Sequence, residues 1–436
     1  MGTRRSISAQ AAARLLEAKD RLAIPLGPGQ PKAFLHALAD REDWEDLEVF
    51  GALLVELFGV FAKRGVRLRS GFFGPAERAL RAAGHAVSFV PADFRRFEEI
   101  ARRFAPRVVA TAGAAPDENG RISLSLHAGA TVPLIHEAAR DPDRLLIVET
   151  SPAYPRTIGL PPDHPHSVSL DEVDVWIESD AEPTALPDSE PGPVEKEIAR
   201  YVTDYIGEGA TLQTGIGGVP NAVVQLLAAG DRGDYGVHSE MFTTGLMHLH
   251  ESGKITNRKG VFDGISVTTF AMGSRALYDW LDGREDVGFL PASIVNDPTT
   301  IASNRRMISI NGALSIDLYG QVAADSMGGV QYSGVGGHED FLAGVGRSEE
   351  GRSLLCLPSS VERGGARRSR IVPSLEPGAL VTSPRHQVDL VVSEYGVAEL
   401  AGRTVEERAR ALAAIAHPDF RSGLAAAARA MEHDGA

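Results

Sequence analysis

The residue best suited to chemistry is a single carboxylate, Glu240, at the expected end of a short apolar strand. It lies in the segment 235–241 (YGVHSEM), and the small residues Thr243, Thr244 and Gly245 follow it. Open α/β sheets bind ligands at the carboxyl ends of their strands, so a carboxylate here could act on a bound molecule. An ionised carboxylate can act as a nucleophile without a base to activate it. A lone glutamate is also commonly a solvated surface charge, and both interpretations stay open at this point.

Two glycine clusters could bring backbone amides close to a ligand. Residues 215–218 (GIGG) follow an apolar strand, and residues 333–337 (SGVGG) form the second cluster. Consecutive glycines permit positive φ and lack Cβ atoms, so main-chain N–H groups can approach a phosphate or a developing oxyanion. A tight turn without a ligand would explain the same residues equally well.

Spacing requirements exclude several other chemistries. Residues 215–220 (GIGGVP) place Pro220 where a dinucleotide-binding loop needs its third glycine, and the chain has no GxxxxGK[ST] or GxSxG motif. A zinc deaminase needs a PCxxC segment, and the chain has one cysteine. No metal site is predicted, because no HExxH helix face is present. Three nearby histidines are expected to pack or to be solvated: His238, His248 and His250.

Composition places the chain among globular proteins that bind small molecules. Its 436 residues predict two domains, and 43% apolar with 23% charged residues is typical of folded chains. The net charge of −14 argues against nucleic-acid partners and anionic membranes. The most apolar run, residues 49–62, is too short to span a bilayer. The single cysteine, Cys356, excludes an internal disulfide, fits a cytoplasmic location and is expected in a buried strand.

The elements that must position these residues are expected in two copies. Four segments of the first half recur in the same order in the second half: 29–31 with 218–220, 117–122 with 317–322, 145–148 with 354–357, and 173–177 with 388–392. Apolar runs without polar alternation predict strands covered on both faces. The expected fold is therefore α/β, with two tandem, duplicated open domains and mainly parallel sheets. The repeat places Gly51 opposite Glu240, so the second half alone would carry the reactive carboxylate.

Proline residues mark the predicted boundary between the two copies. Residues 1–182 are assigned to an N-terminal domain, 183–193 to a Pro-rich linker and 194–436 to a C-terminal catalytic domain. The second domain is expected to open on an amphipathic helix, because apolar residues recur there at helical spacing: Val194, Ile198, Tyr201, Val202 and Tyr205.

The order of motifs from about residue 194 to residue 424 resembles the acetyl-CoA hydrolase/transferase family, that is, family I CoA-transferases similar to 4-hydroxybutyrate, butyrate and acetate CoA-transferases. The matching segments are LQTGIGGVP at 212–220, VHSEM at 237–241, TNRKG at 256–260, ISIN at 308–311, SGVGG at 333–337, SEYGVA at 393–398 and AHPDFR at 416–421. The first half is similar but looser, with IPLGPG at 24–29 and ETSP at 149–152 as its better matches. His338 stands where many relatives carry glutamine.

The resemblance implies an enzyme that moves CoA between an acyl-CoA and a small carboxylic acid, with no permanently bound cofactor. Glu240 would form a glutamyl-CoA thioester in a ping-pong cycle. Candidate oxyanion donors are Asn311, Gly336 and Gly337. The implied CoA-binding residues are Gln213, Gly215, Ile216, Gly217 and Gly218, with Lys259 as a phosphate partner and Glu394 as an auxiliary carboxylate.

Several alternatives stay open beside this interpretation. For Lys259 and Glu394, a plain surface role is equally compatible with the sequence. An acyl-CoA hydrolase would use the same residues and admit water, and a non-catalytic CoA-binding module is a third possibility. The resemblance also implies a homo-oligomer, a dimer or tetramer, whereas the acyl group and the acceptor acid cannot be read from the sequence.

Overall fold

The computed structural model describes residues 5–187 and 190–433, which form two compact units. Unit 1 comprises Met1–Pro187, Glu240–Phe242 and Ile265–Asn296, and unit 2 comprises Asp188–Ser239, Thr243–Gly264 and Asp297–Ala436. The first boundary falls inside the predicted linker. The division differs from the sequence-based one in that 240–242 and 265–296, predicted in the C-terminal domain, belong to unit 1. They do so because their short strands bond to the backbone of the first half, as when Ala271 N–H donates to the Leu126 carbonyl at 2.9 Å.

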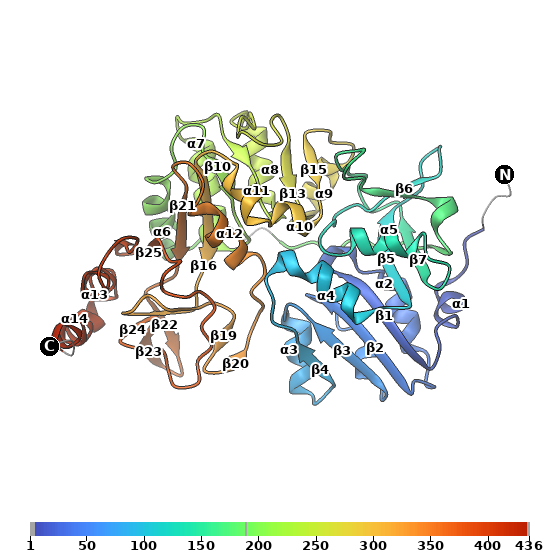
Figure 1. Ribbon diagram of the computed structural model, residues 1–436, viewed down its shortest axis with the longest axis horizontal. Coiled ribbons are helices and arrows are strands. Elements are labelled where there is room, and N and C mark those ends of the chain that lie inside the picture. Colours follow the sequence, from blue (N-terminus) through green and yellow to red (C-terminus); the bar gives the residue numbers. More distant parts are fainter. Residues whose placement is uncertain (1–4, 188–189, 434–436) are drawn as a thin grey trace. The chain divides into compact units, whose positions relative to one another are not determined.

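Unit 1 is built on a seven-stranded sheet of order β4-β3-β2-β1-β5-β7-β9, in which every neighbouring pair is parallel (Figure 1). Its strands are β1 (Lys19–Leu26), β2 (Asp46–Ala52), β3 (Val66–Ser70), β4 (Val87–Phe89), β5 (Val108–Ala114), β7 (Leu145–Ser151) and β9 (Val175–Glu178). Its helices include α1 (Ala9–Ala13), α2 (Lys32–Ala39), α3 (Pro75–Ala82), α4 (Phe97–Phe104), α5 (Val132–Ala138), α9 (Arg275–Leu281) and α10 (Ala292–Val295).

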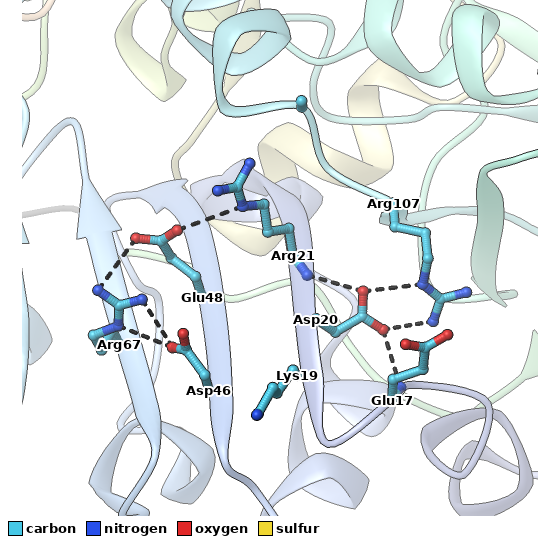
Figure 2. A pocket seen from close by; sticks show the side chains of 9 residues that line it. Glu17, Lys19, Asp20, Arg21, Asp46, Glu48, Arg67 and Arg107 are labelled. Atoms are coloured by element: carbon cyan, nitrogen blue, oxygen red, sulfur yellow. Dashed lines mark hydrogen bonds and ion pairs between the residues drawn. The ribbon is translucent and has the colours of Figure 1, made fainter.

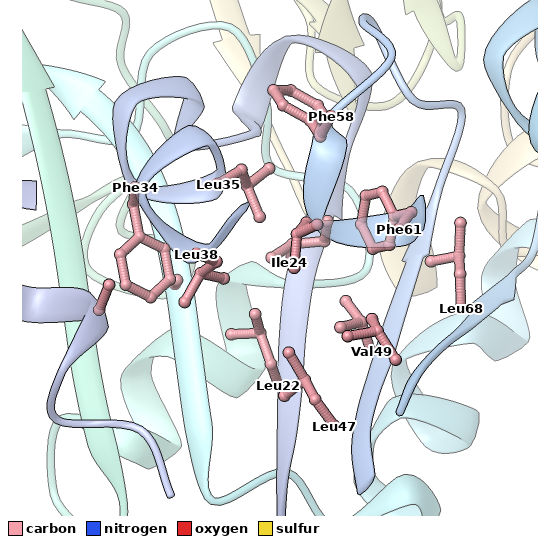
Figure 3. Close-up of a cluster of buried hydrophobic side chains, with 14 of the residues drawn as sticks. Leu22, Ile24, Phe34, Leu35, Leu38, Leu47, Val49, Phe58, Phe61 and Leu68 are labelled. Carbon is pink, nitrogen blue, oxygen red and sulfur yellow. The ribbon is translucent and has the colours of Figure 1, made fainter. Parts of the chain in front are cut away.

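The core of unit 1 forms where α2 covers one face of this sheet. Figure 3 shows Phe34, Leu35 and Leu38 of the helix together with Leu22 and Ile24 of β1, and all five are buried. Strand β5 is buried along its whole length, as the unbroken apolar runs predicted. Strand β3 alternates buried and exposed residues, so this edge of the sheet has one face in solvent.

A charged pocket lies at the amino ends of β1, β2 and β3 (Figure 2). Arg67 pairs with Asp46 at 2.8 Å, and Nε of Arg107 donates to Asp20 at 3.1 Å. Four cationic and four anionic side chains line the pocket: Lys19, Arg21, Arg67, Arg107, Glu17, Asp20, Asp46 and Glu48. Their charges balance, and the pocket is at the end of the strands opposite to the one where open α/β sheets bind ligands. We interpret it as an ion-pair network that stabilises the sheet.

Unit 2 contains a six-stranded sheet of order β11-β10-β16-β21-β25-β26, which is parallel except for the last pair. Its strands are β10 (Thr211–Gln213), β11 (Gly236–Val237), β16 (Met307–Gly312), β21 (Arg352–Cys356), β25 (Leu390–Ser393) and β26 (Gly396–Glu399). Its helices are α6 (Pro193–Thr203), α7 (Gly218–Ala229), α8 (Thr244–Glu251), α11 (Pro298–Ala302), α12 (His338–Val345), α13 (Val405–Ala414) and α14 (Pro418–His433). The predicted α/β class with mainly parallel sheets is confirmed, as is the opening helix α6, which buries Ile198 and Val202. No helix of the described residues is both long and apolar enough to cross a membrane.

The duplication is visible in a pair of matching turns. The Asp117 carboxylate accepts from the N–H groups of residues 119 and 121 at 2.9 and 2.8 Å, and the Asp317 carboxylate accepts from those of 319 and 321 at 3.1 and 2.9 Å. The order β1-β5-β7-β9 in unit 1 also matches β10-β16-β21-β25 in unit 2. The pairing of β1 with β2, compared with that of β10 with β11, places Leu53 and not Gly51 at the position equivalent to Glu240. The first half therefore has no carboxylate at the position equivalent to Glu240, as predicted. That position is Leu53, and the prediction of Gly51 was wrong by two residues.

The two matching aspartates should contribute unequally to stability. Asp317 is fully buried, whereas the Asp117 side chain is 32% exposed. Replacing Asp317 by alanine removes a fully buried acceptor from part-buried N–H donors and is expected to lower the free energy of unfolding by about 2 kcal/mol, against about 1 kcal/mol for Asp117→Ala. Urea unfolding of both variants measures the difference, and equal losses would contradict this account.

Candidate active site

Glu240 stands between β11 and β12 (Met241–Phe242), and its main chain is held by an unusually large number of donors. In unit 1, β12 pairs in parallel with β14 (Phe270–Ala271). The Glu240 carbonyl oxygen accepts from the N–H groups of Thr269 and Phe270 at 2.9 and 3.3 Å. It also accepts from the hydroxyls of Thr268 and Thr269, each at 3.0 Å. The Thr268 hydroxyl has a single hydrogen and also lies 3.0 Å from the Phe270 carbonyl, so three donors, and Thr268 in part, fix the backbone from which the carboxylate projects.

The carboxylate of Glu240 has a side-chain donor that sequence reasoning missed. Nδ2 of Asn296 lies 2.8 Å from Oε2 of Glu240. Asn296 is fully buried and follows α10, whereas Glu240 is partly exposed. The local sequence, an asparagine before Asp297 and Pro298, is typical of an ordinary helix end and contains no sign of this contact.

His127 supports the backbone beneath Glu240. The N–H groups of Ala128 and Gly129 donate to the Thr269 carbonyl at 2.6 and 3.0 Å. The buried His127 ring pairs through Nε2 with the Thr111 hydroxyl at 2.8 Å, and burial lowers the pKa of His127 to about 3, so the imidazole is neutral. The ring packs against Gly29, where a Cβ atom would lie 2.3 Å from Cδ2 of His127. The first half of the chain, whose match to the family motifs is weaker, thus holds the backbone that bonds to Glu240.

The first glycine loop of unit 2 has free space around Gly215 and Gly217 and close packing at Gly218. Gly217 has φ of 126° and ψ of 177°, a conformation that needs glycine, and a Cβ atom at Gly215 or Gly217 would meet nothing within 4 Å. Ile216 is 49% exposed. Gly218 is different, because a Cβ atom there would lie 2.6 Å from Cγ of Glu195 in α6. Residues 215–217 therefore present backbone at the N-terminus of α7, and Gly218 is explained by helix packing.

Other predicted site residues lie at or after strand ends and before α12 in unit 2. Nδ2 of Asn311, in β16, donates to Oε1 of Gln213, in β10, at 3.2 Å. Gly336 has φ of 55°, and Gly337 precedes α12. The carboxylate of Glu394 follows β25 and accepts from the N–H and hydroxyl of Ser359 at 2.8 and 2.6 Å.

His338, the departure from the family pattern, is turned into the protein. Its Nε2 lies 2.7 Å from the Ser383 hydroxyl, and burial lowers the pKa of His338 to about 4. The ring is therefore neutral and engaged with Ser383.

Lys259 does not lie on the surface, so the surface role that the sequence left open for it is wrong. It is fully buried, and its Nζ donates to the carbonyls of Val261 and Phe262, each at 2.6 Å. Burial lowers the pKa of Lys259 to about 7. The ammonium group closes its own loop in this arrangement, and a contact with phosphate stays a prediction.

Replacing Lys259 by methionine tests the loop-closing role. The change strands two carbonyl oxygens and is expected to lower the free energy of unfolding by about 2 kcal/mol at neutral pH. Because the folded pKa of about 7 lies below the ordinary lysine pKa of 10.5, the unfolded chain binds the proton more tightly between these values. Wild-type stability should therefore rise with pH across this window, and the gap to Lys259→Met should widen. Urea titrations at pH 7 and 9 measure it, and a gap that narrows would contradict the sign.

The remaining reactive side chains have structural surroundings. His238 is fully buried and packs edge-on against Phe341, as expected of a packing histidine. Cys356 is buried in β21, and burial raises its pKa to about 12, so the thiol stays protonated. Residues 5–187 and 190–433 contain no group of three or more histidine, cysteine or acidic side chains that could hold a metal ion. Among the predicted site residues, Glu240 belongs to unit 1 and the others belong to unit 2.

Comparisons with known proteins find relatives along nearly the whole chain. A family model for the acetyl-CoA hydrolase/transferase C-terminal domain matches residues 273–428. A succinyl-CoA:cyclohexane-1-carboxylate CoA transferase from Geobacter metallireducens is 36% identical over 96% of this chain and 94% of its own. A 4-hydroxybutyrate coenzyme A transferase from Clostridium kluyveri is 34% identical over 96% of both chains.

Solved structures share the fold across the whole chain. RipA from Yersinia pestis superposes with a TM-score of 0.90 at 31% identity over 98% of each chain. A 4-hydroxybutyrate CoA-transferase from Porphyromonas gingivalis gives a TM-score of 0.79 at 28% identity, also over 98% of each. These matches and the full-length relatives confirm what the order of motifs predicted: the chain belongs to the acetyl-CoA hydrolase/transferase family of enzymes.

Proposed function

We propose that the protein transfers CoA between an acyl-CoA and a small carboxylic acid, and that Glu240 carries the CoA as a thioester in between. The observation that supports this most is the set of hydrogen bonds that fixes the backbone and the carboxylate of Glu240. Its carbonyl oxygen has two N–H groups and two hydroxyls within hydrogen-bond distance, and its Oε2 accepts from Asn296, yet the residue is partly exposed. A nucleophile held in one geometry and open to a substrate loses little orientational freedom when it reacts.

The proposed cycle needs no base. Oε1 of Glu240 attacks the acyl carbon of the thioester, the C–S bond breaks, and CoA leaves as a thiolate from a mixed anhydride. The thiolate then attacks Cδ of Glu240, which releases the first acid as a carboxylate and forms the glutamyl-CoA thioester. An incoming carboxylate reverses both steps and leaves as the new acyl-CoA, which is a ping-pong cycle.

The substrates are proposed from the relatives. The names of the similar proteins specify small acids, among them 4-hydroxybutyrate, butyrate and cyclohexane-1-carboxylate. We propose an acceptor of this size, and CoA as a substrate, not as a bound cofactor. The exposed backbone of residues 215–217 supports a role for the first glycine loop in CoA binding, together with Gln213. Asn311, Gly336 and Gly337 are proposed as oxyanion donors, and Lys259 and Glu394 as further CoA contacts.

Mass spectrometry of the trapped intermediate tests the proposal. The protein is mixed with acetyl-CoA or butyryl-CoA without an acceptor acid, reduced with borohydride or digested at once, and the peptide containing Glu240 is analysed. We expect CoA attached through Glu240 in the sample digested at once. In the borohydride sample we expect the Glu240 carboxyl reduced to an alcohol with release of CoA, and both products should be lost when acetate is added. A peptide that stays unmodified while CoA exchange proceeds at full rate would refute the thioester.

Hydrolysis is the second candidate, because an acetyl-CoA hydrolase from Candida albicans is 29% identical over 49% of this chain. A hydrolase would release free thiol from acyl-CoA without an acceptor acid, whereas a transferase needs the acid. Thiol release measured with and without acetate separates them. A non-catalytic CoA-binding module would show neither reaction, and its CoA affinity would be unchanged by Glu240→Ala.

Assembly and location are proposed from the resemblance alone. We propose a cytoplasmic homo-oligomer, a dimer or tetramer. Light scattering on the purified protein measures the oligomeric state.

A further inference from the structure

We propose that Ser383 is a positioning residue that fixes the second glycine loop, residues 333–337, by holding the ring of His338 at the exit of that loop. The inference rests on the proposed function, because it acts through Gly336 and Gly337 as oxyanion donors. Nε2 of His338, the first residue of α12, lies 2.7 Å from the Ser383 hydroxyl. Ser383 is fully buried and His338 is only 9% exposed, so water competes little with this contact.

The backbone of Ser383 is itself anchored in unit 2. In an antiparallel bridge with β18 (Val322–Ala323), the Val322 N–H donates to the Ser383 carbonyl at 3.1 Å. The Val322 carbonyl accepts from the N–H groups of Thr382 and Ser383 at 2.7 and 3.2 Å. Strand β18 pairs in turn with β17 (Ser315–Asp317). The hydroxyl therefore projects from a fixed part of the sheet.

The entrance of the glycine loop is held by the neighbouring residue, Thr382. The Thr382 hydroxyl donates to Oδ1 of Asp325, and Nε2 of Gln331 donates to Oδ2 of Asp325 at 2.8 Å. The Asp325 carbonyl accepts from the N–H groups of Tyr332 and Ser333, both at 2.9 Å. Two adjacent residues of one segment thus hold both ends of the glycine loop.

The loop needs this support because of its composition. Gly336 has φ of 55°, and glycine loses more conformational freedom on folding than any other residue. Glycine also has no side chain that neighbours could hold, so the conformation of the loop depends on the segments at either end. At the exit, the His338 N–H donates to the Val335 carbonyl at 3.3 Å, which is longer than the usual range. The ring contact with Ser383 therefore supplies the firmer link.

Loss of this link should affect the rate more than substrate binding. Oxyanion donors stabilise a transition state effectively when they are held in place before the charge develops. A released loop would have to be ordered during the reaction, and a displacement of about 1 Å costs on the order of 10²-fold. Because the donors act on developing charge and not on the bound substrate, the loss should appear in kcat and leave KM nearly unchanged.

Single and double substitutions test whether Ser383 acts through His338. Ser383→Ala is expected to lower kcat by about 10–10²-fold, with KM for acyl-CoA and for the acceptor acid changed only a few-fold. His338→Leu should lose as much, whereas His338→Gln, whose amide can still bond to the hydroxyl, should retain most of the wild-type kcat. The double variant Ser383→Ala/His338→Leu should be no slower than either single variant. Equal rates in the glutamine and leucine variants would overturn the proposal.

Rapid quench and mass spectrometry separate positioning from stability. After mixing with butyryl-CoA, Ser383→Ala should form glutamyl-CoA more slowly than the wild type but reach the same amount of adduct per protein. A serine that only stabilises the fold would lower Tm and the amount of adduct and leave the rate of its formation unchanged, which contradicts the proposal. Should Ser383→Ala fail to fold, the two His338 variants carry the test.

Asn304 offers a matched control in unit 2. It is also buried, and its Nδ2 donates to the carbonyls of Thr300 and Ile301 at 3.0 and 3.2 Å. Asn304→Ala should lower Tm and leave kcat unchanged. The inference alone is refuted if Ser383→Ala forms glutamyl-CoA at the wild-type rate, or if the two single losses multiply in the double variant. Absence of any adduct in the wild-type protein would refute the proposed function, and this inference with it.

Discussion

Replacing Glu240 by alanine is expected to reduce CoA transfer by about 10⁴–10⁶-fold, the range seen when a covalent nucleophile is removed. The loss is this large because no other group can accept the acyl group, and the hydrogen bonds on the Glu240 carbonyl would then hold a residue without a carboxylate. Conversion of butyryl-CoA and acetate to acetyl-CoA, followed by chromatography of the CoA esters, measures the rate. The backbone bonds are made by the Glu240 carbonyl, which alanine retains, so Tm should change little.

Two further variants bracket this result. Glu240→Asp keeps the carboxylate but withdraws it by one carbon, and a displacement of about 1 Å costs on the order of 10²-fold, so it should react slowly and still form the adduct. Glu251 is an exposed glutamate on α8 paired with His248, and Glu251→Ala should leave the rate unchanged. A Glu240→Ala enzyme within tenfold of wild type would rule out the nucleophilic role.

Replacing Gly29 by alanine should destabilise unit 1 by about 3 kcal/mol and lower activity with it. The new Cβ atom would lie 2.3 Å from the His127 ring, and neither the ring nor the loop has room to move because both are buried. Overpacking of this kind typically costs 1–3 kcal/mol or more. The ring is next to the amides that bind Thr269, so the disturbance should reach the Glu240 carbonyl. Calorimetry and the transfer assay measure the two effects.

A double substitution identifies the cause. In Gly29→Ala combined with His127→Ala, the clash is removed, so the combined loss should be smaller than the sum of the single losses by about 0.5–3 kcal/mol. Gly207 is a control, since a Cβ atom there meets nothing within 4 Å and its φ is not positive. Gly207→Ala should change stability by less than about 0.5 kcal/mol. Strict additivity of the first pair would show that the ring and the glycine are not in contact.

The sequence was sufficient for the parts of the fold that depend on repeated local patterns. Matching turns at Asp117 and Asp317, buried parallel strands and the helix after the linker all follow from turn chemistry and apolar runs. The sharing of residues between units was not predictable, because β12 and β14 have two residues each and show no periodicity.

The sequence predicts candidate site residues only where the chain itself carries a signal. It predicts Glu240 at the end of a strand, whereas β11 ends at Val237 and Glu240 directly precedes β12, and the glycine loop 215–217 is visible as a cluster. Asn296 contacts Glu240 from 56 positions away, and nothing in its surroundings indicates an amide aimed at a carboxylate. Lys259 was ambiguous for a similar reason, since charged residues are mostly exposed, and its burial depends on two carbonyl acceptors and the nearby charge of Asp263, which the sequence does not reveal.

The inclusion of residues 240–242 and 265–296 in unit 1 limits how this duplicated protein can be divided. A gene cut at the linker would produce a first fragment whose Leu126–Gly129 backbone has lost its bonding partners and a second fragment with an unsupported reactive carboxylate. Neither product would be an autonomous folding module, so the two halves cannot be exchanged separately by recombination.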